Sequence, residues 1–455
     1  MWQHLKAKCA PQNKHNERTK MTNSRNAESD DQTLQILTTL LERVSASTKR
    51  TREGQVTYVI GNNGTGKSRI LGELAEHLKN AKPARSVACI SNSIYDRFKY
   101  GDSGLIRYLG ARNAPNAVFH SAIERQLSRF ILQSMLLDRR LFTRLSEAVH
   151  MDLSFSLGRD VEMEVKKLLD FDLTQTRTRG RGKGKARTHA DLLTSRPLAM
   201  LKRIAEGDGR FDHLTEAQLP VFLRYLDLTL DIDLHVRLPD GSSIGFKDLS
   251  TGEQNRTLLF AKILSAMEEG AVFLIDEPEI SLHLHWQMEF HRTLMKLVSG
   301  LRRFHVVVAT HAPIIISEAA RIDQNRQRNV VMVLRRVLSD GDTPGEQPPG
   351  SAPVTCDIHT FTDVASHEQL VLRYFQTAPY HAHEVSFQIA DAVLRVAEDA
   401  GAHRRGAEEL LREIRNAVGL SDEAKAQIDS AIELIQEKLV PSIQRALVPS
   451  TKETV

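Results

Sequence analysis

Cysteine and long apolar runs are both scarce in this sequence. Its three cysteines, Cys9, Cys89 and Cys356, lie far apart and in no CxxC pair. They therefore argue against a disulfide framework and against a zinc site built on thiolates. No stretch of about 18 apolar residues occurs, which argues against a membrane-spanning helix. The first residues carry charge but no apolar stretch, so we expect no secretory signal.

The composition is typical of a folded globular protein. Apolar residues make up 41% of the chain and charged residues 26%, which is enough apolar material to bury a core. Lysine plus arginine number 61 against 57 for aspartate plus glutamate, so the net charge of +4 permits nucleic-acid contact without requiring it. The length of 455 residues allows several domains, or one enlarged domain with an insertion. We expect a cytoplasmic protein that does not contact a membrane.

Apolar periodicity divides the chain into six segments. After a polar beginning, strand and helix patterns alternate, which is typical of a parallel α/β sheet. Mainly helical patterns then interrupt this alternation before it resumes. The predicted segments are a flexible basic arm (1–32), the first part of an α/β domain (33–102), a helical insertion (103–227) with a basic loop (176–188), the second part of the α/β domain (228–337), a linker loop (338–353) and a mainly helical C-terminal region (354–455).

Short apolar runs and turn residues locate the individual elements. The expected strands cover 55–60, 86–90, 272–275, 305–309 and 330–334. The turn Pro239-Asp240-Gly241 predicts an antiparallel hairpin of strands over 228–236 and 243–246. The expected helices cover 117–149, 254–267 and most of 366–439, together with a short amphipathic helix that contains Leu34, Leu37, Leu40 and Leu41.

The sequence GNNGTGKS, from Gly61 to Ser68, has the GxxxxGK[ST] spacing of a phosphate-binding loop, or P-loop. A predicted strand precedes it and a helical pattern follows, which is the context that the motif requires. Its glycines let backbone N–H groups surround phosphates, and the helix N-terminus adds its dipole. Lys67 would neutralise the phosphates of ATP, and the Ser68 hydroxyl would bind Mg²⁺. The predicted nucleotide-binding residues here are Gly61, Asn62, Asn63, Gly64, Thr65, Gly66, Lys67, Ser68 and Arg69.

Two consecutive carboxylates, Asp276 and Glu277, follow the apolar strand predicted over 272–275. The carboxyl ends of parallel strands are where ligand-facing groups gather. Asp276 would hold Mg²⁺ through water, and Glu277 would polarise the attacking water. Without the P-loop, a solvated turn or a helix N-cap would explain the pair equally well.

A third motif, Leu249-Ser250-Thr251-Gly252-Glu253-Gln254, begins a predicted helix. Ser250, Gly252 and Glu253 would place an anion-binding helix N-terminus where a γ-phosphate could bind. Because the P-loop already provides one phosphate site, a second site of this kind suggests a composite site shared by two subunits. The spacing from Ser250 to Glu253 also fits a simple capping box, and the motif alone does not separate the two roles.

The fourth motif, Val308-Ala309-Thr310-His311-Ala312-Pro313, places His311 at the end of the strand predicted over 305–309. A histidine at this strand end can donate a hydrogen bond to a γ-phosphate and respond to its loss.

These four motifs, in this order, resemble those of ABC-type ATPases. The DEPExxLH form of 276–283 and the ISNSIYDRF segment of 90–98 are similar to the stand-alone RecF/SMC/OLD-like branch of that family. The resemblance covers about 55–100 and 228–337. It implies a P-loop ABC-type ATPase domain of the α/β class, with a mixed sheet and with ATP and Mg²⁺ as cofactors. It also implies that Glu277, His311 and Lys67 take part in catalysis.

The resemblance further implies a head-to-tail homodimer in which Gly61–Ser68 of one subunit and Ser250–Glu253 of the other enclose each ATP. Similar stand-alone ATPases act with nucleases or reverse transcriptases in prokaryotic anti-phage systems. We therefore expect the ATPase sensor or controller component of such a defence system, which acts on a separate effector protein such as a nuclease or toxin. The alternatives are a RecF-like clamp on DNA in repair, a transporter subunit, and a scaffold that does not hydrolyse ATP.

The sequence departs from the family pattern at the segment that follows the second strand. Transporter subunits have a glutamine there, the Q-loop residue, and this chain has none. Either Asn92 or Asp96 would have to take its place. The insertion is also larger than transporters usually carry, which weakens the transporter interpretation.

Six cations alternate with small residues in the predicted basic loop. Such a run is too hydrophilic to pack, and it could contact the phosphate backbone of DNA or simply remain a solvated loop. It contains no aromatic residue, so stacking on single strands is not indicated. The cations are Arg177, Arg179, Arg181, Lys183, Lys185 and Arg187.

Overall fold

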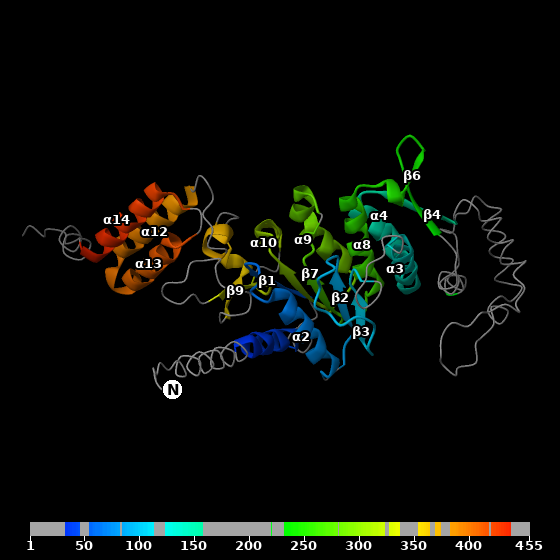
Figure 1. The fold of residues 1–455 in the computed structure, drawn as a ribbon, viewed down its shortest axis with the longest axis horizontal. Coiled ribbons are helices and arrows are strands. Elements are labelled where there is room, and N and C mark those ends of the chain that lie inside the picture. The colour runs from blue at the N-terminus through cyan, green and yellow to red at the C-terminus, as the bar shows by residue number, and fades with distance from the viewer. Residues whose placement is uncertain are drawn as a thin grey trace, which may run out of the picture. The chain divides into compact units, whose positions relative to one another are not determined.

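The computed structural model of the chain describes about three fifths of its residues (Figure 1). Almost all of the predicted arm, the basic loop with its six cations, and the linker loop lie outside the described residues, so the predictions for them stay open. The described residues are 32–45, 54–81, 84–112, 123–157, 220, 232–280, 282–323, 327–336, 354–364, 369–374, 383–417 and 420–437.

A seven-stranded sheet has the strand order β10-β9-β1-β8-β7-β2-β3. β9 is parallel to β1, and β2 is parallel to both β7 and β3, whereas β10 is antiparallel to β9. This mixed, mainly parallel sheet with its helices confirms the predicted α/β class. Its strands are β1 (Gln55–Gly61), β2 (Val87–Ser91), β3 (Ile106–Leu109), β7 (Val272–Asp276), β8 (His305–Thr310), β9 (Val330–Arg336) and β10 (Val354–Thr360).

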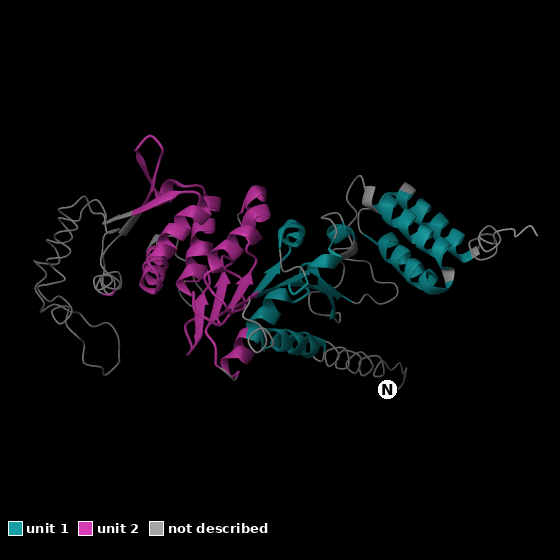
Figure 2. Ribbon diagram, turned by 180° about the vertical axis from the view of Figure 1, so that it is seen from behind, with its two compact units in different colours: residues 1–46, 55–74, 307–455 teal, residues 47–54, 75–306 magenta. Residues whose placement is uncertain are grey.

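The chain forms two compact units, which Figure 2 shows in different colours. Unit 1 comprises residues 1–46, 55–74 and 307–455. Its strands β1 and β9 are almost continuously apolar and buried, as expected for parallel strands covered on both faces. In their register Gly61, the last residue of β1, pairs with Leu334. The helices here are α2 (Lys67–Lys79), which continues into the other unit, α10 (Pro313–Ile322), α12 (His383–Glu398), α13 (Ala400–Arg415) and α14 (Asp422–Glu437).

Unit 2 comprises residues 47–54 and 75–306. In it β2 lies between β7 and β3, and Ser91 at the end of β2 pairs with Asp276 at the end of β7. A second, three-stranded antiparallel sheet has the order β4-β5-β6. The remaining elements are β4 (Asp152–Leu157), β5 (Ile232–Arg237), β6 (Ser243–Gly245), α3 (Ile123–Leu137), α4 (Arg140–Val149), α8 (Thr251–Ser265) and α9 (Leu284–Val298).

The insertion departs from the predicted pattern in two places. The helix expected over 117–149 is two helices, because Asp138 ends α3 and its side chain accepts the backbone N–H of Arg140 at 2.9 Å. That hydrogen bond starts α4, since aspartate competes with the helix ladder for backbone donors. Few strands were expected in this region, yet β3 and β4 form there. β4 alternates polar and apolar residues in its sequence, and it extends the predicted hairpin, with Leu153 opposite Val236.

The predicted helix near the N-terminus is present over 32–45. Leu37 and Leu40 are buried as expected, but Leu34 is 54% exposed. Ile36 and Val44 complete the buried face instead, so the apolar stripe is shifted from the predicted one.

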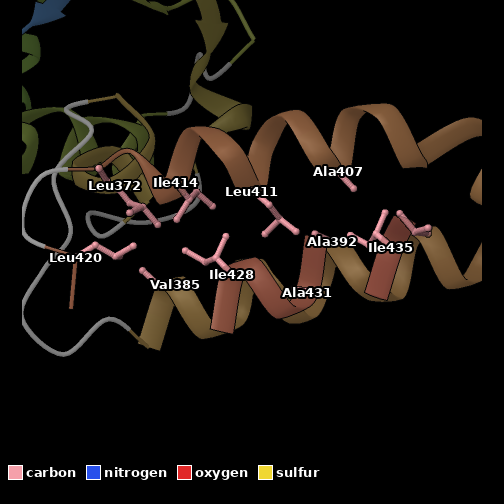
Figure 3. Close-up of a cluster of buried hydrophobic side chains, with 12 residues drawn as sticks. Leu372, Val385, Ala392, Ala407, Leu411, Ile414, Leu420, Ile428, Ala431 and Ile435 are labelled. Carbon is pink, nitrogen blue, oxygen red and sulfur yellow. The ribbon is translucent and has the colours of Figure 1, made fainter. Parts of the chain in front are cut away.

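The C-terminal region is mainly helical, as predicted, but it begins with β10. This strand was not predicted because it is an edge strand of largely exposed residues, and such strands lack a long apolar run. Helices α12, α13 and α14 pack around a shared apolar core that includes Leu411, Ile414, Ile428 and Ile435 (Figure 3). Among the described residues, no helix is long and apolar enough to cross a membrane.

This core makes a testable prediction. Leu411 is 0% exposed, so Leu411→Ala should lower the free energy of opening of α12–α14 by about 2–5 kcal/mol. Native-state hydrogen exchange resolved by segment measures this value. Leu394→Ala is the matched control, because Leu394 of α12 is 63% exposed and should change little. Equal losses of protection in both variants would contradict the packing.

Candidate functional site

The P-loop connects β1 to α2 in unit 1, in the strand–loop–helix context that the motif requires. Gly61 has no room for a side chain, because a Cβ there would lie 2.5 Å from the Leu334 carbonyl oxygen and 2.8 Å from Thr65 Oγ1. Gly64 and Gly66 have φ angles of 77° and 88°, in the left-handed region that favours glycine. The three glycines of the motif are therefore needed for the shape of the loop.

Lys67 is buried inside its own loop. Its Nζ donates to the carbonyl oxygens of Gly61 at 2.8 Å and Asn62 at 3.2 Å. Thr65 Oγ1 also donates to Asn62 O, at 2.9 Å, which holds the first turn of the loop closed. The amine is thus held by carbonyl oxygens of the loop itself, and its role at a phosphate stays a prediction. The loop, the buried cation and the following helix fit a bound nucleoside triphosphate.

Ser68 and Arg69 lie in the first turn of α2. Ser68 is in the position from which a P-loop hydroxyl binds Mg²⁺. The Arg69 guanidinium donates to Thr33 Oγ1 at 2.9 Å and pairs with Glu73 at 3.2 Å. These contacts hold it to the helix over 32–45 and to its own helix, and a role for Arg69 in nucleotide binding stays a prediction.

Sequence reasoning missed Arg336, which contacts the P-loop. Its Nη2 donates to the carbonyl oxygen of Gly64 at 3.0 Å. The preceding residue, Arg335, forms ion pairs with Glu413 of α13 and, at 3.7 Å, with Asp357 of β10. The only sequence signal is the position of these arginines at the end of β9, which pairs with the strand that leads into the P-loop.

His311 follows β8 directly and is exposed. Thr310 Oγ1 accepts the backbone N–H of Ala312 at 3.0 Å, and Pro313 then starts α10. This local turn holds His311 at the strand end, where the sequence placed it. Its role at a phosphate stays a prediction.

In unit 2, the carboxylate pair lies at the end of β7, whose five residues are all buried. Asp276, the last of them, is 2% exposed, whereas Glu277 is half-buried. Glu277 has a φ of 50°, a left-handed backbone conformation that costs a non-glycine residue on the order of 1–2 kcal/mol. Such conformations cluster at functional sites, where the surrounding structure holds them in place.

Ser250 forms a complete capping box at the start of α8. Its backbone N–H and its Oγ donate to Glu253 Oε2 at 2.9 and 2.7 Å, and its Oγ accepts the Glu253 N–H at 3.3 Å. The simpler of the two roles weighed for this motif is therefore present. Ser250 is exposed and Gly252 half-exposed, which leaves this helix end accessible to an anion.

Asn92 joins the end of β2 to α8. Its Nδ2 donates to the Asn255 carbonyl oxygen at 3.0 Å, and its Oδ1 accepts from Lys262 Nζ at 3.0 Å. Lys262 also donates to the Ser91 carbonyl oxygen at 2.8 Å, and its side chain is fully buried. Burial lowers the pKa of Lys262 to about 7, while the nearby Asp96 carboxylate favours the charged amine.

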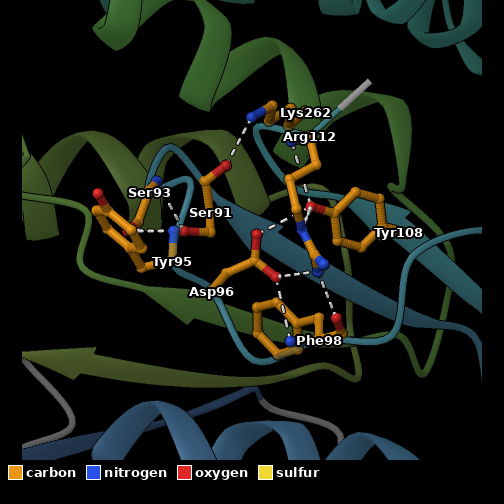
Figure 4. A network of polar contacts seen from close by, with 8 residues as sticks. All are labelled: Ser91, Ser93, Tyr95, Asp96, Phe98, Tyr108, Arg112 and Lys262. Atoms are coloured by element: carbon orange, nitrogen blue, oxygen red, sulfur yellow. Dashed lines mark hydrogen bonds and ion pairs between the residues drawn. The ribbon is translucent and has the colours of Figure 1, made fainter. Parts of the chain in front are cut away.

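Asp96, the other substitute considered for the missing glutamine, belongs to a buried polar network (Figure 4). Its Oδ1 accepts from Arg112 at 2.9 Å and from the Phe98 N–H at 3.1 Å. Its Oδ2 accepts from the Tyr108 hydroxyl at 2.9 Å. Burial, and then the Asp96 charge, raise the pKa of Tyr108 to about 12. Both Asp96 oxygens are thus engaged, and the choice between Asn92 and Asp96 stays open.

Arg256 fixes the other side of α8. Its guanidinium lies over the Trp286 ring of α9, 3.1 Å from the ring centroid, and donates to the Ala148 carbonyl oxygen of α4. Burial lowers its pKa to about 10. Two buried basic side chains of α8, Lys262 and Arg256, therefore attach this helix to β2, α4 and α9.

Mg²⁺ bound together with a nucleotide takes most of its ligands from phosphate and water. Within the described segments, no group of three or more His, Cys, Asp and Glu side chains is arranged to hold a metal by itself. Ser68 and Asp276 remain the predicted metal-binding residues.

The buried amine of Lys262 should give stability a specific pH dependence. Between about pH 7 and its unfolded pKa of roughly 10.4, the unfolded chain keeps a proton that the folded chain lacks. The free energy of unfolding of unit 2 should therefore rise with pH across that window. Lys262→Met should remove a rise on the order of a few kcal/mol, measured by hydrogen exchange of α8 against pH.

Lys296→Met is the control for this experiment, because Lys296 is exposed on α9. Titrating groups common to both variants cancel when each profile is compared with the wild type. A Lys262→Met profile parallel to the wild type would show that the amine does not titrate as described.

The capping box predicts that Ser250→Ala will lower the local stability of the first turn of α8 by about 1 kcal/mol. Ser250→Asn should restore it, because asparagine also caps helices. Hydrogen exchange of that turn reports the cap. ATP turnover of the asparagine variant then isolates any second role: retained turnover means capping alone, and lost turnover means phosphate contact.

Comparison with known proteins adds a family match. Residues 181–316 match the family described as an AAA ATPase domain, a segment that contains Ser250, Asp276, Glu277 and His311 but not the P-loop. No curated protein matches the chain. A metal-chelate type ABC transporter in an inward-facing conformation aligns with 68% of this chain and 86% of its own, at 14% identity. Its TM-score of 0.23 is too low to carry an argument. The family match therefore supports ATP binding and hydrolysis as the general activity of this chain.

Proposed function

We propose that the chain is an ATP-driven switch that closes as a homodimer on ATP and reopens after hydrolysis. The observation that carries the proposal is the acidic pair after β7, in which Glu277 is held with a φ of 50°. The AAA ATPase domain match covers this pair, and a complete P-loop precedes it in the chain.

The P-loop would bind the phosphates through its backbone N–H groups. To meet them, Lys67 must give up its hydrogen bonds to the Gly61 and Asn62 carbonyl oxygens. Exchanging neutral acceptors for phosphate oxygens strengthens the hydrogen bonds of the amine, because they become charge-assisted. Binding of ATP is thus linked to a rearrangement inside the loop.

Hydrolysis is assigned to the acidic pair. Glu277 would accept a hydrogen bond from the attacking water and orient it, and His311 would donate to the γ-phosphate. Ser68 and Asp276 would hold Mg²⁺, which neutralises charge on the phosphates when bound. The left-handed backbone of Glu277 sets the direction in which its side chain leaves the strand end, which supports a role that needs the carboxylate at a defined place.

Closure would bring Ser250, Gly252 and Glu253 of one subunit to the ATP of the other. The accessible N-terminus of α8 supports this role, since helix N-termini bind anions. The output of the cycle would pass to a separate effector protein, a nuclease or toxin. The motif resemblance favours anti-phage defence as its setting. Closure on DNA, as in a repair clamp, is the other outcome to test.

Glu277→Gln should reduce ATP turnover on the order of 10²-fold or more, because it removes a positioned base and leaves binding intact. Phosphate release by the purified chain in Mg²⁺ measures this loss. Glu268→Gln is the matched control, since Glu268 is an exposed glutamate outside the motif. Equal background turnover in wild type and Glu277→Gln would contradict hydrolysis at this residue.

The same variant tests closure. Light scattering should show Glu277→Gln as a dimer in ATP and Mg²⁺ and as a smaller species without ATP. Lys67→Ala should not dimerise under either condition. A dimer that forms only when duplex DNA is added would favour the clamp over the effector-linked switch.

A further inference from the structure

Unit 2 contains a cavity outside the ATPase motifs. It lies between the segment from 100 to 112, which includes β3, and one face of α3, and its volume is about 350 Å³. That is within the range of roughly 300–1,000 Å³ typical of small-molecule sites. Arginine, aspartate, glutamine and tyrosine side chains are among its lining residues, so it differs from an apolar packing defect.

The described residues that line the cavity carry a net positive charge. Among them, Arg107, Arg112 and Arg129 are balanced only by the carboxylate of Asp102. Arg112 is offset by its ion pair with Asp96. Arg107 donates to two neutral acceptors, Ser265 O at 2.6 Å and Gln133 Oε1 at 3.2 Å, so no carboxylate offsets it among the described residues. A cavity of this composition favours an anion.

Two tyrosines also line the cavity. The rings of Tyr100 and Tyr108 meet edge to face, with centroids 5.3 Å apart. Tyr108 is held by its hydroxyl contacts with Asp96 and Arg112, whereas Tyr100 is 40% exposed and presents ring surface to the solvent. Gln126 lines the opposite side from α3 and can both donate and accept hydrogen bonds, as the edge of a nucleobase does.

We propose that this cavity binds a nucleoside monophosphate. The phosphate, with a charge between −1 and −2, would meet Arg107 and Arg129, and the base would stack on Tyr100. The size of the cavity and its few cations match one phosphate better than the three that a P-loop accepts. This site is additional to the proposed ATPase site.

A ligand in this cavity could influence the ATPase motifs of the same unit through a chain of hydrogen bonds. Arg112 lines the cavity and also donates to Asp96 and to the Phe98 carbonyl oxygen. A phosphate that draws on this guanidinium would weaken those bonds and loosen the segment that begins at Asn92. Asn92 in turn bonds Asn255 and Lys262 of α8. Occupancy would therefore act on the helix that carries the capping box.

Calorimetric titration of the full chain tests the proposal. The probes are the four ribonucleoside monophosphates, and the protein carries Lys67→Ala so that the P-loop does not contribute. At least one probe should bind with one site per chain. Arg129→Glu, an exposed position on α3, should weaken that binding about tenfold or more, and Tyr100→Ala should also weaken it.

Arg140→Glu is the matched control, because it makes the same charge change at an exposed arginine that does not line this cavity. It should leave the affinity unchanged. The proposal is overturned if no monophosphate binds the Lys67→Ala protein, even where the wild type binds one, or if Arg129→Glu and Arg140→Glu weaken binding equally. Binding of a single-stranded oligonucleotide without any monophosphate binding would also overturn it, in favour of a nucleic-acid surface.

Discussion

The arrangement of unit 2 depends on the buried amine of Lys262. A lysine side chain with no exposed surface is costly, and this one is compensated by the Ser91 carbonyl oxygen and the Asn92 amide. These bonds fix the position of α8 along its axis relative to the end of β2. Because Ser91 pairs with Asp276, the same contacts relate the capping box of α8 to the acidic strand end. Apolar packing alone would allow the helix to slide, whereas directional bonds do not.

Much of the fold can be predicted from sequence because its central strands are buried on both faces. Such strands appear as short, continuous apolar runs, and those at β1, β2, β7, β8 and β9 were placed within about two residues of their observed ends. The P-loop was recognisable for a related reason. Gly61 and Gly66 serve a backbone shape that other residues cannot adopt, so their spacing identifies the loop without knowledge of its surroundings.

The contacts that connect these elements could not be predicted in the same way. Lys262 and Ser91 are 171 residues apart in sequence, and a lysine within a helix resembles an ordinary surface residue. The same holds for Arg336 at the P-loop and for Arg107 in the cavity. Each contacts a residue that is far away in sequence, so the sequence around the arginine does not reveal its role. β10 was missed because an edge strand has little apolar pattern, and β4 because its six alternating residues follow a mainly helical pattern and pair with the distant β5.

The left-handed backbone at Glu277 has a consequence for the evolution of this chain. A glycine there would relieve steric strain, so a search for heat-resistant variants would tend to favour that exchange. The resulting protein would fold well and lack the carboxylate assigned to catalysis. Selection for durability and selection for turnover therefore act in opposite directions at one residue, and a glutamate persists there only while the chemistry is under selection.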